Sequence, residues 1–260
     1  MTPYKAMQES NSKPAGYDPR EAEKKWWESG TTAAGRAGGY PPGHYFAHSV
    51  VRSRIYDTLV SLGCHSGSDI LDLGCGDGED AVFVGKASRR ITGVDLSATA
   101  LKKFATKGFT GLMADVRDLP FPNNSFDFTV CFGLLHHLVG QGDMKIYLKE
   151  FTRVTRPGGH VLAMEPNVFN HSGLLMNIFN TLRPGITGLV PHERALSPLK
   201  LRDTFAAAGL TSVEYAAASF VWNRFPLPVS RFISRHENSI RIRAPFKLFG
   251  WFEIIYGRKP

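Results

Sequence analysis

A glycine-rich turn places one carboxylate beside three glycines. The sequence there reads Asp72-x-Gly74-x-Gly76-x-Gly78, after a short apolar run and before residues with helical spacing. Glycine allows a sharp turn and lets a ligand approach the backbone N–H groups, because no Cβ stands in the way. The dinucleotide spacing Gly-x-Gly-x-x-Gly is absent, since Glu79 stands where the third glycine belongs. A carboxylate repels a pyrophosphate and attracts an ammonium or a sulfonium, so the turn predicts a positively charged ligand.

Two further acids follow the next two apolar runs of the chain. Asp95 ends the first run, about twenty residues after the turn, where a strand-end carboxylate accepts hydrogen bonds from ribose hydroxyls. Asp115 ends the second run and suits an adenine amino group, with Leu96 and Val116 on the two sides of the ring. The three acids together predict an adenosine-containing ligand.

The chain here resembles the class I S-adenosylmethionine-dependent methyltransferases, in particular the small-molecule and lipid branch that includes the ubiquinone and menaquinone methyltransferases. The resemblance covers roughly residues 17–210 and rests on five blocks in order: Asp72-Leu73-Gly74-Cys75-Gly76-Asp77-Gly78, Gly93-Val94-Asp95-Leu96-Ser97, Ala114-Asp115, Leu119-Pro120-Phe121-Pro122-x-x-Ser125-Phe126-Asp127, and Arg153-Val154-x-x-Pro157-Gly158-Gly159. It implies S-adenosylmethionine as cofactor and S-adenosylhomocysteine as product. The residues expected to contact the cofactor are Tyr17, Asp72, Gly74, Cys75, Gly76, Asp95, Leu96, Asp115, Val116 and Phe132.

Strand and helix patterns alternate along the chain, which predicts an α/β fold with a doubly wound parallel sheet. The resemblance implies a Rossmann-like sheet of seven strands with the last one antiparallel, N-terminal helices and an insertion after the fifth strand. The expected strands are 70–73, 91–94, 109–114, 126–132, 160–164, 210–216 and 251–256, and the expected helices are 46–62, 79–87 and those capped by Ser97, Asp143 and Ser197. The expected organisation is a flexible tail 1–16 and a single domain 17–260, with cap helices 17–62, an acceptor-pocket insertion 168–195 and a basic, aromatic insertion 219–247.

Composition narrows the class of protein. The chain has 260 residues, of which 43% are hydrophobic, and this suits one α/β domain. No run approaches the length of a membrane span and no apolar signal core follows Met1, so we expect a cytoplasmic protein. The cysteines Cys64, Cys75 and Cys131 are too widely spaced for a disulfide framework or a metal site. The net charge of +8 admits nucleic acid, anionic lipid or an acidic substrate as partner.

Histidines near the expected cofactor are the candidate bases for a hydroxyl or carbon acid acceptor. Their ordinary pKa of about 6.5 lets them take a proton at neutral pH. His136 and His137 follow the fourth strand, at the mouth of the predicted site. The resemblance implies that both histidines line the wall of the predicted pocket. A purely structural role, in which either ring only makes hydrogen bonds within the fold, is the alternative that stays open. His192 is the third candidate, although His192-Glu193-Arg194 is also typical of a gate or a salt-bridged turn. Methyl transfer needs no metal, and none is predicted.

The insertion 168–195 is rich in apolar residues and lies beside the predicted pocket, which favours a small lipophilic acceptor methylated on O, N or C. Nucleic-base amino groups are disfavoured, because no Asn/Asp-Pro-Pro-aromatic motif follows the fourth strand. Two alternatives stay open, a non-catalytic S-adenosylmethionine-binding scaffold or sensor and a methyltransferase that acts on RNA.

The stretch 219–247 is the most basic and aromatic part of the chain. Six basic residues there face one acid, Glu237, with Trp222, Phe225 and Phe232 among the interleaved aromatics. Basic and apolar side chains together predict peripheral docking on an anionic membrane. The alternative is that the apolar residues pack on the sheet and the arginines form a solvated face.

Overall fold

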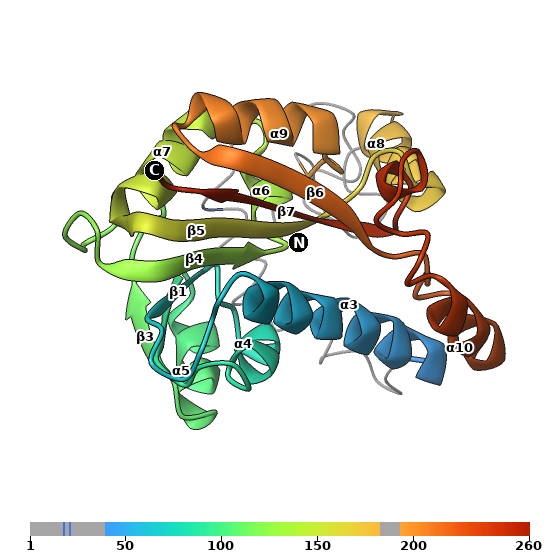
Figure 1. Ribbon diagram of the computed structural model, residues 1–260, viewed down its shortest axis with the longest axis horizontal. Helices are drawn as coiled ribbons and strands as arrows, with labels where there is room; N and C mark the ends of the chain where they lie inside the picture. The colour runs from blue at the N-terminus through green and yellow to red at the C-terminus, as the bar shows by residue number, and fades with distance from the viewer. Residues whose placement is uncertain (1–17, 19–20, 22–39, 183–192) are drawn as a thin grey trace, which may run out of the picture.

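The computed structural model describes residues 18, 21, 40–182 and 193–260. Its centre is a seven-stranded sheet in the order β3-β2-β1-β4-β5-β7-β6 (Figure 1). The strands are β1 Ile70–Leu73, β2 Ile91–Asp95, β3 Thr110–Met113, β4 Phe126–Phe132, β5 Thr155–Pro166, β6 Thr211–Ser219 and β7 Phe252–Arg258. Strands β1 to β5 pair in parallel, and β7 is antiparallel to both β5 and β6. The predicted Rossmann-like fold class is confirmed.

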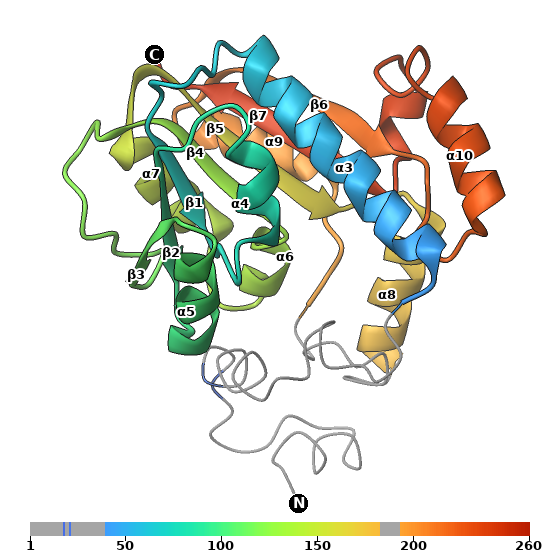
Figure 2. The same cartoon turned by 90° about the horizontal axis from the view of Figure 1, so that it is seen from below.

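Helices cover both faces of the sheet (Figure 2). They are α3 Pro42–Ser61, α4 Glu79–Val84, α5 Ala98–Thr106, α6 Leu135–Leu138, α7 Met144–Val154, α8 His171–Leu182, α9 Pro198–Ala207 and α10 Leu227–His236, with a 3-10 turn η2 at Phe246–Leu248. Side chains of α3, α4 and α5 form one apolar cluster with the sheet, and those of α6, α7 and α9 form the other. The central strands β1 and β4 are therefore buried on both sides, as parallel strands require, while the edge strand β3 is exposed.

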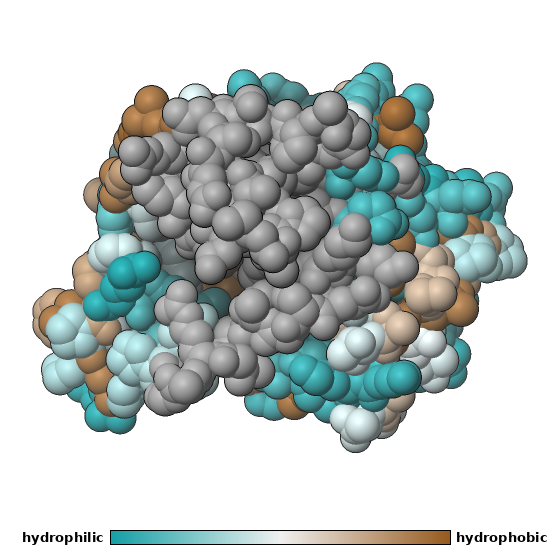
Figure 3. Space-filling model, turned by 180° about the vertical axis from the view of Figure 1, so that it is seen from behind, coloured by the Kyte–Doolittle hydropathy of each residue, from teal (hydrophilic) through white to brown (hydrophobic). Residues whose placement is uncertain are grey.

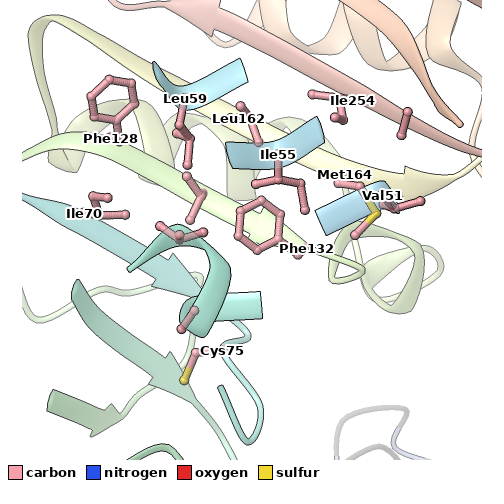
Figure 4. Close-up of a cluster of buried hydrophobic side chains, with 14 of the residues drawn as sticks. Val51, Ile55, Leu59, Ile70, Cys75, Phe128, Phe132, Leu162, Met164 and Ile254 are labelled. Carbon is pink, nitrogen blue, oxygen red and sulfur yellow. The ribbon is translucent and has the colours of Figure 1, made fainter. Parts of the chain in front are cut away.

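Alternation along β5 shows how the strands serve both clusters. Val161 and Ala163 point to the α7 side, while Leu162 and Met164 point to α3. Figure 4 shows the α3 side, where Val51, Ile55 and Leu59 meet the sheet residues. This packing fixes the position of each strand in the sheet. The carboxyl ends of β1, β2, β4 and β5 then lie at one edge.

Sequence and structure agree well at the helix starts. The Ser97 side chain accepts from Ala100 N, the Asp143 side chain from Lys145 N and the Ser197 side chain from Lys200 N, as capping residues do. Two elements begin four or more residues before the expected start, and the other bounds differ by three residues or fewer. Helix α3 begins at Pro42 rather than 46, because proline suits the first turn of a helix. Strand β5 begins at Thr155 rather than 160, because Thr155 already pairs with Phe126 across a register shift.

The two predicted insertions contain regular structure that the sequence had not indicated. The segment 168–195 holds α8, and the stretch 219–247 holds α10. The predicted tail 1–16 and most of the cap region 17–39, including Trp26 and Trp27, lie outside the described residues. The domain boundaries therefore stay a prediction.

Candidate active site

The glycine turn after β1 has the backbone that the sequence predicted. Gly74, Gly76 and Gly78 have φ of 67°, 52° and 85°, in the left-handed region that side chains disfavour. A Cβ on Gly74 would lie 2.8 Å from Leu134 Cδ1, so the turn also packs tightly there. A Cβ on Gly76 would meet nothing within 4 Å. Open space beside a bare backbone is what a bound ligand needs.

Asp95 is held rigidly at the end of β2. Its Oδ2 accepts from Gly76 N at 2.9 Å, and its Oδ1 accepts from Ser97 N at 2.8 Å. The carboxylate thus ties the glycine turn to the start of α5. Each carboxylate oxygen has two lone pairs and can accept more than one hydrogen bond, so the two backbone bonds are compatible with binding of ligand hydroxyls.

Asp115, just after β3, is engaged with a residue that the sequence analysis did not single out. Arg117 donates from Nη2 to Asp115 Oδ2 at 2.6 Å and from Nε to Oδ1 at 3.0 Å. The Arg117 backbone N–H also donates to Oδ1 at 2.9 Å. The ion pair orients the carboxylate at the carboxyl end of β3, next to Asp95 in the sheet order. The signal for Arg117 was its place two residues after the acid.

One cavity brings many of the predicted residues together. Its lining is Gly74, Asp95, Leu96, Ser97, Ala114, Asp115, Val116, Arg117, Gly133, Leu134, His137, Leu138, Gln141 and Tyr147. Five of the predicted cofactor residues and one predicted base are in this set. The predicted residues Asp72, Cys75, Gly76, Phe132 and His136 are not in it, and Tyr17 and His192 lie outside the described residues.

Asp72 is not among the residues that line the cavity, and only 3% of its surface is exposed. Burial raises the pKa of its carboxyl well above the ordinary value, and the negative charges of Asp80 and Asp95 act in the same direction. A cationic group in the cavity would offset these effects and favour the ionised form. The predicted direct contact between Asp72 and the ligand stays a prediction.

Glu165, at the end of β5, fixes the histidine segment. Its Oε1 accepts from Leu134 N at 3.0 Å and Leu135 N at 2.7 Å. Its Oε2 accepts from His136 N at 3.2 Å and lies 2.7 Å from His136 Nδ1. The carboxylate is fully buried, so it sets the start of α6 and the ring of His136. Sequence reading placed Glu165 only at a strand end and missed this role.

His137 has a carboxylate partner of its own. Its Nδ1 lies 3.0 Å from Glu193 Oε1, and its ring centroid is 4.0 Å from that of His136. Side-chain atoms of these two histidines and Glu193 lie within 4.8 Å of one another, a grouping that linear spacing did not indicate. The predicted absence of a metal stays a prediction. The structure thus holds two imidazole–carboxylate pairs, a hydrogen-bonded one between His136 and Glu165 and an ion-pair contact between His137 and Glu193. His137 also lines the cavity.

Glu253 lies beside Glu165 in the register of β7 and β5. It is fully buried, and neither of its carboxyl oxygens has a hydrogen-bond partner among the described residues. Burial raises the pKa of Glu253 well above the ordinary value, and the neighbouring charge of Glu165 raises it further. The neutral acid is therefore the favoured form, which avoids two adjacent buried charges.

Comparison with known proteins identifies the domain. Residues 71–163 match the family model described as Methyltransferase domain. These residues form a methyltransferase domain. A demethylmenaquinone methyltransferase of Staphylococcus aureus (strain JH9) is 33% identical over 127 residues, which are 45% of this chain and 50% of that protein. The chain spans about half the length of the curated relatives it matches.

Solved structures share the fold over a larger part of the chain. A Thermotoga maritima S-adenosylmethionine-dependent methyltransferase, titled a possible histamine N-methyltransferase, has a TM-score of 0.65 and 18% identity, and the match covers 84% of this chain and 92% of that one. Phosphoethanolamine N-methyltransferase 2 of Haemonchus contortus, solved with S-adenosyl-L-methionine, has a TM-score of 0.62 and 14% identity, covering 95% of this chain and 61% of that one. The predicted family resemblance of the methyltransferase domain is confirmed.

Proposed function

We propose that the protein transfers the methyl group of S-adenosylmethionine to an O, N or C atom of a small lipophilic acceptor. The observation that carries the proposal is the single cavity that contains the strand-end acids Asp95 and Asp115 on one side and His137 on the other. The residues fit the cofactor, because the glycine turn offers bare backbone beside open space at Gly76. The name of the quinone-type relative supports a lipophilic acceptor.

The binding roles follow from the positions of the groups. Asp95 is fixed by two backbone N–H groups and would accept from the ribose hydroxyls of the cofactor. Asp115 would accept from the adenine amino group, with Leu96 and Val116 at the two faces of the ring. The buried carboxyl of Asp72 would balance positive charge from behind the turn. When bound, the cofactor supplies a methyl group on a sulfonium, a carrier that is already activated.

Proximity and orientation then provide most of the rate, and a hydroxyl or carbon acid acceptor also needs a base. His137 is the residue we assign, because it lines the cavity and has a carboxylate at Nδ1. The Glu193 carboxylate lies on the Nδ1 side of the ring, so we assign Nε2 as the nitrogen that accepts the acceptor's proton. The Glu193 carboxylate stabilises the resulting imidazolium. Glu165 orients the segment through backbone donors and acts as a positioning residue.

The experiment is a methyl-transfer assay with methyl-labelled S-adenosylmethionine. Purified protein is incubated separately with organic-soluble extract, hydrophilic metabolites and total RNA, and labelled products are identified by mass spectrometry. Label in the organic-soluble fraction supports the proposal, and label only in hydrophilic metabolites contradicts the lipophilic acceptor. Label in RNA supports the nucleic-acid alternative. Tight cofactor binding without transfer to any fraction supports the scaffold or sensor alternative.

Contact with a membrane belongs to the same proposal, because a lipophilic acceptor resides in a lipid phase. Within the described part of the chain, no helix is long and apolar enough to cross a bilayer. Peripheral attachment would therefore use the surface of the fold, and the predicted stretch 219–247 is the sequence candidate for it.

A further inference from the structure

Helix α8 has its polarity reversed relative to an ordinary surface helix. Its exposed residues form an apolar stripe at spacings of four, made of Leu174, Leu175, Ile178, Phe179 and Leu182. These side chains are between 41% and 68% exposed. A helix that packs on a protein core turns such a stripe inward. The apolar stripe of α8 instead faces outward.

The inward side of α8 is held by polar contacts. Asn177 Nδ2 donates to Ala195 O at 3.0 Å, and Asn177 Oδ1 accepts from Ala195 N at 2.7 Å. Asn180 is fully buried and donates from Nδ2 to Glu193 O at 3.1 Å. Three hydrogen bonds thus fix which face of the helix points out. The reversed polarity is set by the fold and does not result from a loose helix.

The region from α10 to η2 presents a second apolar set. Exposed residues in it are Val229, Phe232, Ile240, Ile242, Phe246 and Phe249. With α8 and Phe169, these segments hold 12 of the 19 exposed large hydrophobic residues of the described chain. An exposed apolar patch of this kind marks an interaction site.

Positive charge accompanies the apolar residues, and exposed negative charge does not. Arg224, Arg231, Arg235 and Arg243 are exposed, whereas residues 166–182 and 219–252 contain one acid, Glu237. Glu237 is buried and accepts from Phe220 N at 2.7 Å, with Arg54 nearby at 3.8 Å. The one carboxylate of these segments is therefore used inside the fold and does not offset the surface arginines.

The two segments lie at one end of the molecule. Asn170 Nδ2 donates to Phe249 O at 3.1 Å, and the rings of His171 and Trp222 are 4.7 Å apart. Figures 1 and 2 both show α8 and α10 on the right, far from α5. In Figure 3 this end lies at the left, where brown apolar residues alternate with teal polar ones.

We propose that this end, formed by residues 169–182 and 224–249 and here named the α8–α10 surface, docks on the surface of a membrane that contains anionic lipids. The apolar residues enter the boundary between head groups and acyl chains, and the arginines contact acidic head groups. A second copy of the chain fits less well, because two such surfaces would bring the exposed arginines together. The inference does not depend on methyl transfer.

Docking would also place the candidate active site near the lipid phase. Helix α8 follows directly after β5, and the chain returns from it to Glu193, the partner of His137. Asn180 of α8 donates to Glu193 O, and the Glu193 side chain lies 3.0 Å from His137 in the cavity lining, so α8 is two contacts away from the cavity. This connects the surface to the proposed acceptor class.

The test is flotation of the full chain with vesicles of phosphatidylcholine alone and of phosphatidylcholine with phosphatidylglycerol, at low and high salt. Two variants attack the surface: Arg231→Gln with Arg235→Gln on α10, and Leu174→Ser with Ile178→Ser and Leu182→Ser on α8. Their matched controls are Lys102→Gln with Lys103→Gln on α5, and Ile146→Ser on α7, which are also exposed. All changed residues lie at the surface, and circular dichroism checks that each variant folds.

We expect salt-sensitive binding to anionic vesicles, a decrease of about tenfold or more in the partition coefficient of the arginine variant, and a clear loss in the α8 variant. The controls should bind like the wild type. Failure of the wild-type protein to float with anionic vesicles overturns the proposal. So does unchanged binding of both surface variants, or a stable dimer in light scattering that the α8 variant dissociates. The flotation assay contains neither cofactor nor acceptor. Failure of the protein to bind vesicles would therefore leave the proposed methyl transfer untouched.

Discussion

The two halves of the molecule build their sites in different ways. In the half from β1 to β4, the groups that we propose for cofactor binding lie at successive strand ends, each within a few residues of its own apolar run. In the half from β5 onward, the groups come from distant segments: Glu165 reaches back to residues 134–136, and Glu193 meets His137. The family match covers residues 71–163, which is mainly the first half. The proposed cofactor site is thus built from groups that are close to their strands in the sequence, and the proposed acceptor side is built from tertiary contacts between distant segments.

The largest effect on the second half should come from Glu165→Ala. The change leaves the N–H groups of Leu134, Leu135 and His136 without their buried acceptor, which we expect to cost about 3 kcal/mol or more of unfolding free energy. Glu165→Gln keeps one oxygen acceptor and should lose less. Denaturant unfolding measures both, and equal stability of the alanine variant and the wild type would show that Glu165 does not hold this segment.

The next effect concerns the assigned base. His137→Gln should lower kcat about 100-fold or more for a hydroxyl or carbon acid acceptor, because general-base catalysis contributes that much. Binding of S-adenosylhomocysteine should stay within a few-fold of the wild type. The matched control is His160→Gln, a partly buried histidine in the middle of β5 that is not in the cavity lining. A variant with unchanged kcat would remove His137 from the chemistry.

The sequence allowed more site residues to be predicted in the first half of the molecule than in the second. Asp95 and Asp115 were identifiable because strand ends of a parallel sheet meet at one edge, so position along the chain gives position in space. The role of Glu165 could not be identified in this way. Nothing in the sequence around Glu165 shows that its side chain hydrogen-bonds to a segment about thirty residues earlier. Asn177 and Asn180 would ordinarily be placed outward on α8, and only the contacts with residues 193 and 195 reveal the reversal.

The smallest effect should come from Glu253→Gln, which contrasts with Glu165 beside it. A carboxyl with a raised pKa stabilises the fold at low pH, and this contribution is lost as pH rises through the raised pKa. The glutamine does not ionise, so the variant should match the wild type at low pH and become more stable than it by about 1 kcal/mol at high pH. Thermal unfolding across a pH series measures this, with exposed Glu214→Gln as control. A variant less stable than the wild type at every pH would mean that Glu253 is ionised and paired.

Calorimetric titration of S-adenosylhomocysteine into the wild type and Asp95→Ala tests the cofactor site most directly, since Asp95 links the glycine turn to α5 inside the cavity. We predict binding at one site per chain and a loss of about 1.5–3 kcal/mol in the variant, or roughly one to two decades in affinity. Asp203→Ala, an exposed acid on α9, should bind like the wild type. Equal affinity of Asp95→Ala and the wild type, or no binding by the wild type, would contradict the assignment.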